Sequence, residues 1–287
     1  MKASNFVALY GPKGLDAWEN AAVDLFRRGD VPENPWVPLH LTDGVHQATA
    51  WVSSDYLTIG EGADQLRLPL RPAKAQEILN LDGSLLPTPW LDYQIWRAAQ
   101  KMDRQPMPTN KGASLGQYAA HDAQINAQLS QKGGRDVRAM PLAGHKKDVV
   151  ISATYKPNTV VIHGWYRPDP DVFKDTRKWD DPSPLKQPQQ NLSNEHGSYW
   201  VDYSHGIRKV HPTMIVDGKL MSTEEIYRSR DLSKLVSAEG PLLITRYPTT
   251  TPFAPTFPTY PPPTVPGTYA DRGLRIIVDE YERRGRP

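Results

Sequence analysis

Residues 194–208, with the sequence NEHGSYWVDYSHGIR, bring two histidines, an aspartate, an arginine and several hydroxyl groups into one short span. His196 and His205 can exchange a proton near neutral pH. Asp202 can orient a neighbouring histidine and stabilise its cation, and Arg208 can hold a carboxylate or phosphate through two parallel hydrogen bonds. These side-chain types indicate general acid–base chemistry with anchoring of an anionic substrate group.

We expect this span to be a strand, which would present alternate side chains on the same face. One face would then carry His196, Ser198, Asp202 and Ser204. His205 would lie on the opposite face, unless Gly206 marks a bend that turns it toward Asp202. The expected catalytic residues are His196, Asp202 and His205. The expected substrate-binding residues of the span are Tyr199, Tyr203, Ser204 and Arg208. A purely structural use of the histidines and aromatic rings is the alternative.

A second polar run, His145-Lys146-Lys147-Asp148, precedes an apolar stretch that is typical of a buried strand. Alternation would place His145 and Lys147 on one face, and Lys146 and Asp148 on the other. A lysine whose pKa falls on burial can act as a base or nucleophile, and a charged lysine can bind an anion. We expect the run to bind substrate together with Trp165, although a solvated group of charges is an equal alternative.

Histidine and carboxylate side chains alone can hold zinc with a position left open for water. The best candidate ligands are His196, Asp202 and His205, with His145 or His163 as replacements. The sequence contains no HExxH motif, so a divalent metal such as zinc is a candidate cofactor only. The remaining histidines have no polar cluster near them in sequence and are expected to be structural: His40, His46, His121 and His211.

Nucleophilic catalysis by serine or cysteine fits less well. Ser204 precedes His205, but Asp202 stands where the nucleophile elbow G-x-S-x-G requires its first glycine. Adjacent side chains of a strand also diverge, so His205 would not be the base for Ser204. The chain has no cysteine, which excludes thiol catalysis, disulfides and cysteine-ligated zinc.

The elements around these residues indicate an α+β fold, with a largely antiparallel β-sheet core and a block of three helices inserted between two sets of strands. Apolar spacing predicts helices over residues 15–28, 72–81, 89–102 and 114–131. Asp-Gly pairs predict hairpins over residues 36–52 and 213–221. Further strands are expected over residues 55–70, 145–152 and 159–166, and residues 167–193 are expected to form a long loop.

Residues 1–247 are expected to form a single α+β domain, with 1–135 and 136–247 as two lobes in the alternative. Residues 248–268 are rich in proline and predict a strap or linker, and residues 269–287 predict a tail.

With 34 basic and 32 acidic residues among 287, the net charge of +2 gives no overall signature of nucleic-acid binding. No apolar run approaches the roughly 20 residues of a membrane-spanning helix. The first residues lack the apolar core of a signal peptide, so we expect either a cytoplasmic chain or a mature secreted form. The lack of cysteine and the many prolines, tyrosines and tryptophans favour the secreted, extracytoplasmic alternative.

The motif Ser204-His205-Gly206-Ile207-Arg208, together with the earlier pair His163-Gly164, resembles the L,D-transpeptidase catalytic domain, whose signature is an HG pair followed by SHGC and Ile-Arg. The nucleophilic cysteine of that family is missing and the two HG pairs lie farther apart, so the resemblance implies a cell-wall-related β fold without transpeptidase chemistry. Residues 55–99 and 144–210 are also similar to uncharacterised bacterial secreted proteins with KKDVV and YxDYSHGIR strands, which implies export.

The leading hypothesis is an exported hydrolase that acts on a cell-envelope or extracellular polymer, polysaccharide or peptide. A non-catalytic module that binds a glycan or peptide of the envelope or of an extracellular assembly is the second hypothesis. In a third, the proline-rich strap itself is the ligand of a partner protein.

Overall fold

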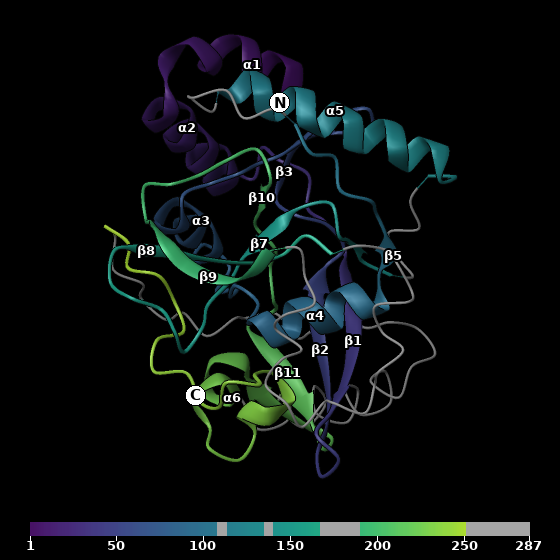
Figure 1. The fold of residues 1–287 in the computed structure, drawn as a ribbon, viewed down its shortest axis with the longest axis vertical. Coiled ribbons are helices and arrows are strands. Elements are labelled where there is room, and N and C mark those ends of the chain that lie inside the picture. Colours follow the sequence, from purple (N-terminus) through teal and green to yellow (C-terminus); the bar gives the residue numbers. More distant parts are fainter. Residues whose placement is uncertain (108–113, 135–139, 167–189, 251–287) are drawn as a thin grey trace.

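The computed structural model describes residues 1–107, 114–134, 140–166 and 190–250, and within them confirms the α+β class. Two helices, α1 (Ala3–Tyr10) and α2 (Leu15–Arg28), precede the first strand. They lie beside the long helix α5 (Leu115–Gln131) at one end of the molecule (Figure 1). Helix α2 spans the expected residues and ends where Gly29 adopts a left-handed conformation, a common helix stop. Helix α1 is not among the helices predicted from apolar spacing.

One sheet, the hairpin sheet, is antiparallel and has the strand order β1-β2-β11-β12. Its strands are β1 (Trp36–Thr42), β2 (Gln47–Ser53), β11 (Thr213–Val216) and β12 (Lys219–Ser222). Both expected hairpins are confirmed. In the second hairpin Asp217 and Gly218 have φ values of 48° and 79°, the positive pair that a two-residue turn between twisted strands requires.

The other four-stranded sheet, the central sheet, has the strand order β10-β7-β8-β9. Its strands are β7 (Lys147–Val149), β8 (Thr159–Gly164), β9 (Gln190–Gly197) and β10 (His205–Gly206). The pair β10–β7 is parallel, whereas β7–β8 and β8–β9 are antiparallel. The expected buried strands 145–152 and 159–166 are thus present, although both are shorter than predicted.

In chain order, α3 (Pro72–Leu79) and α4 (Pro89–Ala98) follow β4, and α5 precedes β6. Helix α4 ends earlier than predicted because residues 100–101 form β5 (Gln100–Lys101), which pairs in parallel with β6 (Leu142–Ala143). The remaining elements are the hairpin β3 (Thr58–Glu61) and β4 (Asp64–Arg67), the helix α6 (Thr223–Arg228), and short 3₁₀ turns at Gly11–Lys13 and Ser233–Leu235.

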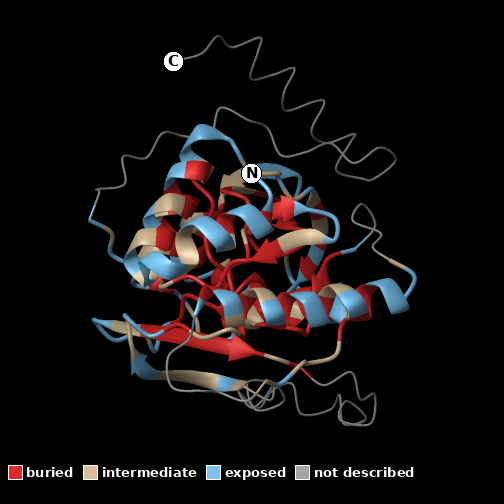
Figure 2. Cartoon of the chain, turned by 90° about the horizontal axis from the view of Figure 1, so that it is seen from above, coloured by how far each residue is buried: buried red, intermediate tan, exposed pale blue. Residues whose placement is uncertain are grey.

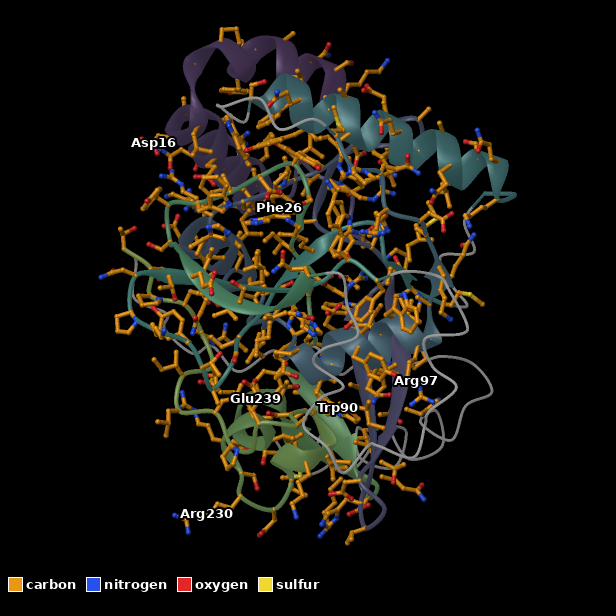
Figure 3. The ribbon with its side chains drawn as sticks, in the orientation of Figure 1. Asp16, Phe26, Trp90, Arg97, Arg230 and Glu239 are labelled. Carbon is orange, nitrogen blue, oxygen red and sulfur yellow. The ribbon has the colours of Figure 1, made fainter. Side chains whose placement is uncertain are left out.

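Buried residues lie on the inner segments of the chain, and exposed residues follow the outer faces of the helices (Figure 2). The largest core cluster contains side chains from residues 1–135 and from residues 136–247, the two segments considered above as alternative lobes. Helix α4 illustrates the pattern, because its Asp92 is buried whereas its Arg97, labelled in Figure 3, is exposed. No helix in the described ranges combines the length and apolar character needed to cross a bilayer.

The prediction of a single strand over residues 194–208 is wrong. Strand β9 ends at Gly197, a turn follows, and β10 contains only His205 and Gly206. His196 and Asp202 therefore do not share a strand face. The expected loop 167–193 is also too long, because β9 begins at Gln190. Residues 167–189, most of the proline-rich strap and the whole tail lie outside the described residues.

Candidate active site

The parallel pair β7–β10 brings the two polar runs together. His205 is the partner of Lys147 and Gly206 is the partner of Asp148 in this ladder. The run beginning at His145 and the run ending at Arg208 therefore lie side by side.

Three side chains of these runs meet where the buried region reaches the surface. Lys147 Nζ lies 3.6 Å from Asp202 Oδ2, and His205 Nε2 lies 3.9 Å from the same oxygen. The side chains of Lys147 and Asp202 are each 16% exposed, whereas that of His205 is fully buried. We call this group the Asp202 triad. The Asp202 carboxylate of the triad is partly exposed, and the His205 imidazole is buried.

The Asp202 carboxyl and the His205 imidazole have different charges at neutral pH. Burial opposes ionisation of Asp202, but the adjacent His205 and Lys147 outweigh it and lower the pKa of the carboxyl to about 2. Burial lowers the pKa of the His205 imidazole to about 4, although the Asp202 carboxylate partly offsets this. At neutral pH the aspartate is therefore ionised and the histidine is neutral.

Ser204 donates two hydrogen bonds to the carboxylate of Asp202. The backbone N–H of Ser204 donates to Asp202 Oδ1 at 2.7 Å, and the Ser204 hydroxyl donates to the same oxygen. These bonds fix one carboxylate oxygen and leave the other toward Lys147 and His205. Ser204 therefore orients Asp202, and its hydroxyl is committed to that bond.

Lys146 is buried and joins three segments of the chain. Its ammonium donates to the Tyr203 carbonyl at 2.8 Å and lies 3.2 Å from His121 Nδ1 on α5. Burial lowers the pKa of Lys146 to about 8. The side chain thus supports the turn that carries Asp202 and does not face solvent. His121, expected to be an isolated structural residue, is part of this cluster.

Arg208 is likewise directed inward. It is fully buried, and its guanidinium donates to the Ser53 carbonyl at 2.9 Å and also to the Leu142 carbonyl. Its Nε lies 3.6 Å from Asp148 Oδ1, and its charge lies over the Tyr56 ring at 4.2 Å. The arginine holds the hairpin sheet and β6 against β10, and is not in a position to bind external substrate.

Two buried carboxyl groups lie close together, that of Asp92 on α4 and that of Asp148 on β7 of the central sheet. The pKa of Asp92 is raised by burial to about 7, and burial together with the nearby Asp92 raises that of Asp148 well above its usual range. Tyr56 donates its hydroxyl to Asp148 at 2.7 Å, and His163 Nδ1 lies 2.6 Å from Asp92 Oδ2. Tyr166 also donates to Asp92, at 3.0 Å. At neutral pH this region holds protons that isolated carboxyl groups would have released.

A third buried group centres on Arg67, which pairs with Asp55 at 2.8 Å and with Asp122 at 3.2 Å. His145 is fully buried beside it, with Nε2 3.6 Å from Asp55. Burial lowers the pKa of His145 to about 4. Arg67 is the only charged residue in the leucine-rich segment 66–70, whereas Asp55 and Asp122 have other polar residues beside them, so the sequence gives no signal that these three side chains form one buried group.

The aromatic side chains before Asp202 face outward. Tyr199 is 74% exposed, and the ring of His196 stacks on that of Trp200 at 5.0 Å between centroids. His196 is itself exposed, in contrast to His205. Tyr203 is half-buried, and its hydroxyl both donates to the Met107 carbonyl and accepts from the Met107 N–H. The exposed rings are available to a ligand, whereas Tyr203 fixes neighbouring backbone.

No group of three or more potential metal ligands comes together within the ranges that the structure describes. His196, Asp202 and His205 accordingly do not form a ligand set. Several buried polar atoms of the central sheet nevertheless have no hydrogen-bond partner among the described residues: both ring nitrogens of His205, Nε2 of His163 and Oδ1 of Asp148. Such atoms are few in folded proteins, where they usually meet water or a ligand.

Comparisons of the chain with protein-family models, with curated proteins and with solved structures find no match.

Proposed function

We propose that the chain is an exported hydrolase of a cell-envelope or extracellular polymer, and that the Asp202 triad carries out its proton transfers. A hydrolase needs a proton acceptor that can reach the attacking water, and a group that stabilises the negative charge that develops on the substrate. Asp202 and Lys147 are the partly exposed members of the triad and would fill these two roles.

The order of pKa values suggests how the proton would move. Asp202 would take a proton from the attacking water. His205, whose pKa is about 4 and whose Nε2 lies 3.9 Å from the carboxylate, would accept that proton after its ring moves within hydrogen-bond distance of Asp202. His205 would then hold the proton behind the carboxylate and return it to the leaving group through Asp202. His205 would thus assist from a buried position without touching the polymer.

One observation carries this proposal: an ionised, partly exposed carboxylate lies 3.9 Å from a buried imidazole whose two nitrogens have no hydrogen-bond partner in the described part of the chain. A structural histidine at this depth would be expected to be hydrogen-bonded. An imidazole that lies beside a carboxylate and has no hydrogen-bond partner is more consistent with a catalytic role than with a structural role.

The proposal is tested by incubating the full chain with a panel of purified peptidoglycan, acidic and neutral polysaccharides and casein, and measuring released reducing ends and amines. Replacement of His205 by Gln should abolish the activity found. The matched control is His46→Gln, because His46 also lies near an aspartate, with Nδ1 2.6 Å from Asp217, but at the hairpin tips. Equal activity of the two variants would refute the proposed role.

The exposed aromatic surface favours a second candidate, a non-catalytic module that binds a glycan or peptide. Tyr199 and the stacked pair His196–Trp200 offer flat apolar faces on which sugar rings can stack, independently of any chemistry at Asp202. Saturable binding across the panel with no released product would support this candidate over the hydrolase.

A further inference from the structure

The backbone leaves the strand conformation at the end of β8, at Gly164 and Trp165. Both residues have positive φ values, 104° and 57°. Glycine adopts this region freely, whereas a bulky residue there is strained and keeps the conformation only when its surroundings enforce it. Trp165 is therefore held in a conformation that its own backbone disfavours.

The residues on either side of Trp165 enforce this conformation. Gly164 is the ladder partner of Lys147, and a Cβ atom at Gly164 would lie 3.0 Å from Asp92 Oδ2 on α4. Tyr166 is buried and donates its hydroxyl to the same carboxyl group at 3.0 Å. Because both neighbours are packed against α4, the backbone at Trp165 has little freedom to relax.

The conformation of Trp165 also decides which side chain its ring meets. Lys147 is paired with Gly164, so in a regular strand the next residue, Trp165, would lie on the face opposite to Lys147. In the structure the Lys147 ammonium instead lies 5.0 Å from the centroid of the Trp165 ring, within the range of a cation–π interaction. The strained conformation thus makes a contact that a regular continuation of β8 would not make.

Lys147 lies between this ring and Asp202. Its Nζ is 3.6 Å from Asp202 Oδ2, which is beyond hydrogen-bond distance although the two charges are opposite. Without another attraction we would expect a direct bond, because charge-assisted hydrogen bonds measure about 2.7–2.9 Å. Such a bond would engage both the carboxylate that accepts a proton and the ammonium that stabilises negative charge in the proposed reaction.

We propose that Trp165 is a positioning residue of the Asp202 triad: its ring holds the Lys147 ammonium short of a direct hydrogen bond with Asp202, so that both groups stay available to substrate. The roles of Lys147 and Asp202 in hydrolysis rest on the proposed function, whereas the position of Lys147 over the ring does not. Strained residues cluster at functional sites, where the strain is part of the mechanism.

NMR of the lysine side chains in the full chain tests the position of Lys147, whose signals are assigned by their loss in Lys147→Met. An aromatic ring shifts protons over its face upfield, so the ε-protons of Lys147 should lie upfield of ordinary lysine signals. The shift should disappear in Trp165→Leu and persist in part in Trp165→Phe. It should also persist in Asp202→Asn, because the ring holds the ammonium. Ordinary Lys147 signals in the original chain would refute the proposal.

Lys209 offers a matched control, because its ammonium lies 5.0 Å from the centroid of the Trp36 ring. The upfield shift of Lys209 should be lost in Trp36→Leu and kept in Trp165→Leu, which also shows that the latter variant is folded. If Trp165→Leu is not folded, Trp165→Phe and Asp202→Asn decide the question.

A second control concerns Arg104, whose guanidinium lies 5.4 Å from the centroid of the Trp165 ring. Arg104→Met should leave the upfield shift of Lys147 in place, because the proposal assigns the position of Lys147 to the ring itself. Loss of the shift in this variant would contradict that assignment.

Activity tests the consequence for the reaction. On a polymer that the chain cleaves, Trp165→Leu should lower kcat about tenfold with little change in KM, and Trp165→Phe should retain most of the activity. In a Lys147→Met background, Trp165→Leu should cause no further loss, because Trp165 acts through Lys147. An equal loss in both backgrounds would refute the positioning role.

These outcomes separate this proposal from the proposed function. Upfield Lys147 signals in a chain that cleaves no polymer would refute the hydrolase and leave the position of Lys147 over the ring supported. Conversely, cleavage that depends on Asp202, in a chain with ordinary Lys147 signals, would refute only the role of Trp165.

Discussion

The ring of Tyr56 occupies the space that a side chain at Gly206 would need. A Cβ atom at Gly206 would lie 2.6 Å from two carbons of that ring, and 2.8 Å from the Cβ of Lys146. The missing side chain lets β10 approach the ring while the Tyr56 hydroxyl binds Asp148. The pairing of the adjacent His205 with Lys147 of β7 depends on this contact.

Gly206→Ala should therefore destabilise the protein by about 1–3 kcal/mol through overpacking, seen as a lower Tm. Gly116→Ala in α5 is the control, because the nearest atom to its added Cβ is 3.8 Å away and alanine stabilises a helix by roughly 0.5–1 kcal/mol relative to glycine. If both variants unfold at the same temperature, the close contact at Gly206 is not a constraint.

Local patterns in the sequence predict much of this fold. The apolar spacing of α2 and the Asp-Gly pairs of the two hairpins are signals carried within a few residues, and all three elements form as expected. The pairing of β10 with β7 has no such signal, because a two-residue strand gains its partner only from tertiary packing. This is why residues 194–208 are wrongly predicted as one strand.

The candidate site could be predicted only in part for the same reason. The polar runs that contain Lys147 and His205 are visible because their residues are consecutive. Arg67 and Asp92 lie in largely apolar segments and His121 lies in a polar helix, and only the fold brings them to Asp55, His163 and Lys146. The spacing of residues in a sequence does not show which side chains are buried, so it could not predict that Arg208 is buried.

Arg67→Met should destabilise the protein strongly, by about 3–5 kcal/mol, because it leaves Asp55 and Asp122 buried without their cation. Arg27→Met removes the guanidinium of an exposed pair with Asp24, and should cost less than about 1 kcal/mol. Both values come from urea unfolding. Similar losses in the two variants would contradict the role assigned to Arg67.

Asp92→Asn should change how stability depends on pH. Burial raises the pKa of Asp92 from 3.8 to about 7 in the folded chain, so its stabilising contribution is complete below about pH 4 and is lost as the pH rises through about 7. Asparagine cannot ionise. The free energy of unfolding of the variant, relative to the original chain, should therefore rise by on the order of 4 kcal/mol between about pH 4 and about pH 8.

Urea unfolding of both chains at the two pH values gives this difference. Asp217→Asn, which replaces an exposed carboxyl whose pKa is lowered by hydrogen bonds from Gln47 and His46, should show no such rise. A constant difference between Asp92→Asn and the original chain would show that Asp92 is already ionised in the folded state.

His205 should titrate far below His46 in an NMR titration of the histidine ring signals. Burial lowers the pKa of His205 to about 4, whereas the hydrogen bond to Asp217 raises the pKa of His46. Asp202→Asn should lower the pKa of His205 further, because the carboxylate favours the imidazolium. A His205 signal that titrates near the ordinary histidine value would place the ring in contact with solvent.

The most direct measurement is the kcat of Asp202→Asn, beside that of Asp217→Asn, on the polymer of the panel from which the proposed hydrolase releases product. Both aspartates lie beside a histidine, but only Asp202 also lies beside Lys147 at the central sheet. We predict that Asp202→Asn loses at least about a hundredfold in kcat while it remains folded at the assay temperature, as expected for a lost proton acceptor, and that Asp217→Asn keeps full activity. Full activity of Asp202→Asn would contradict the account.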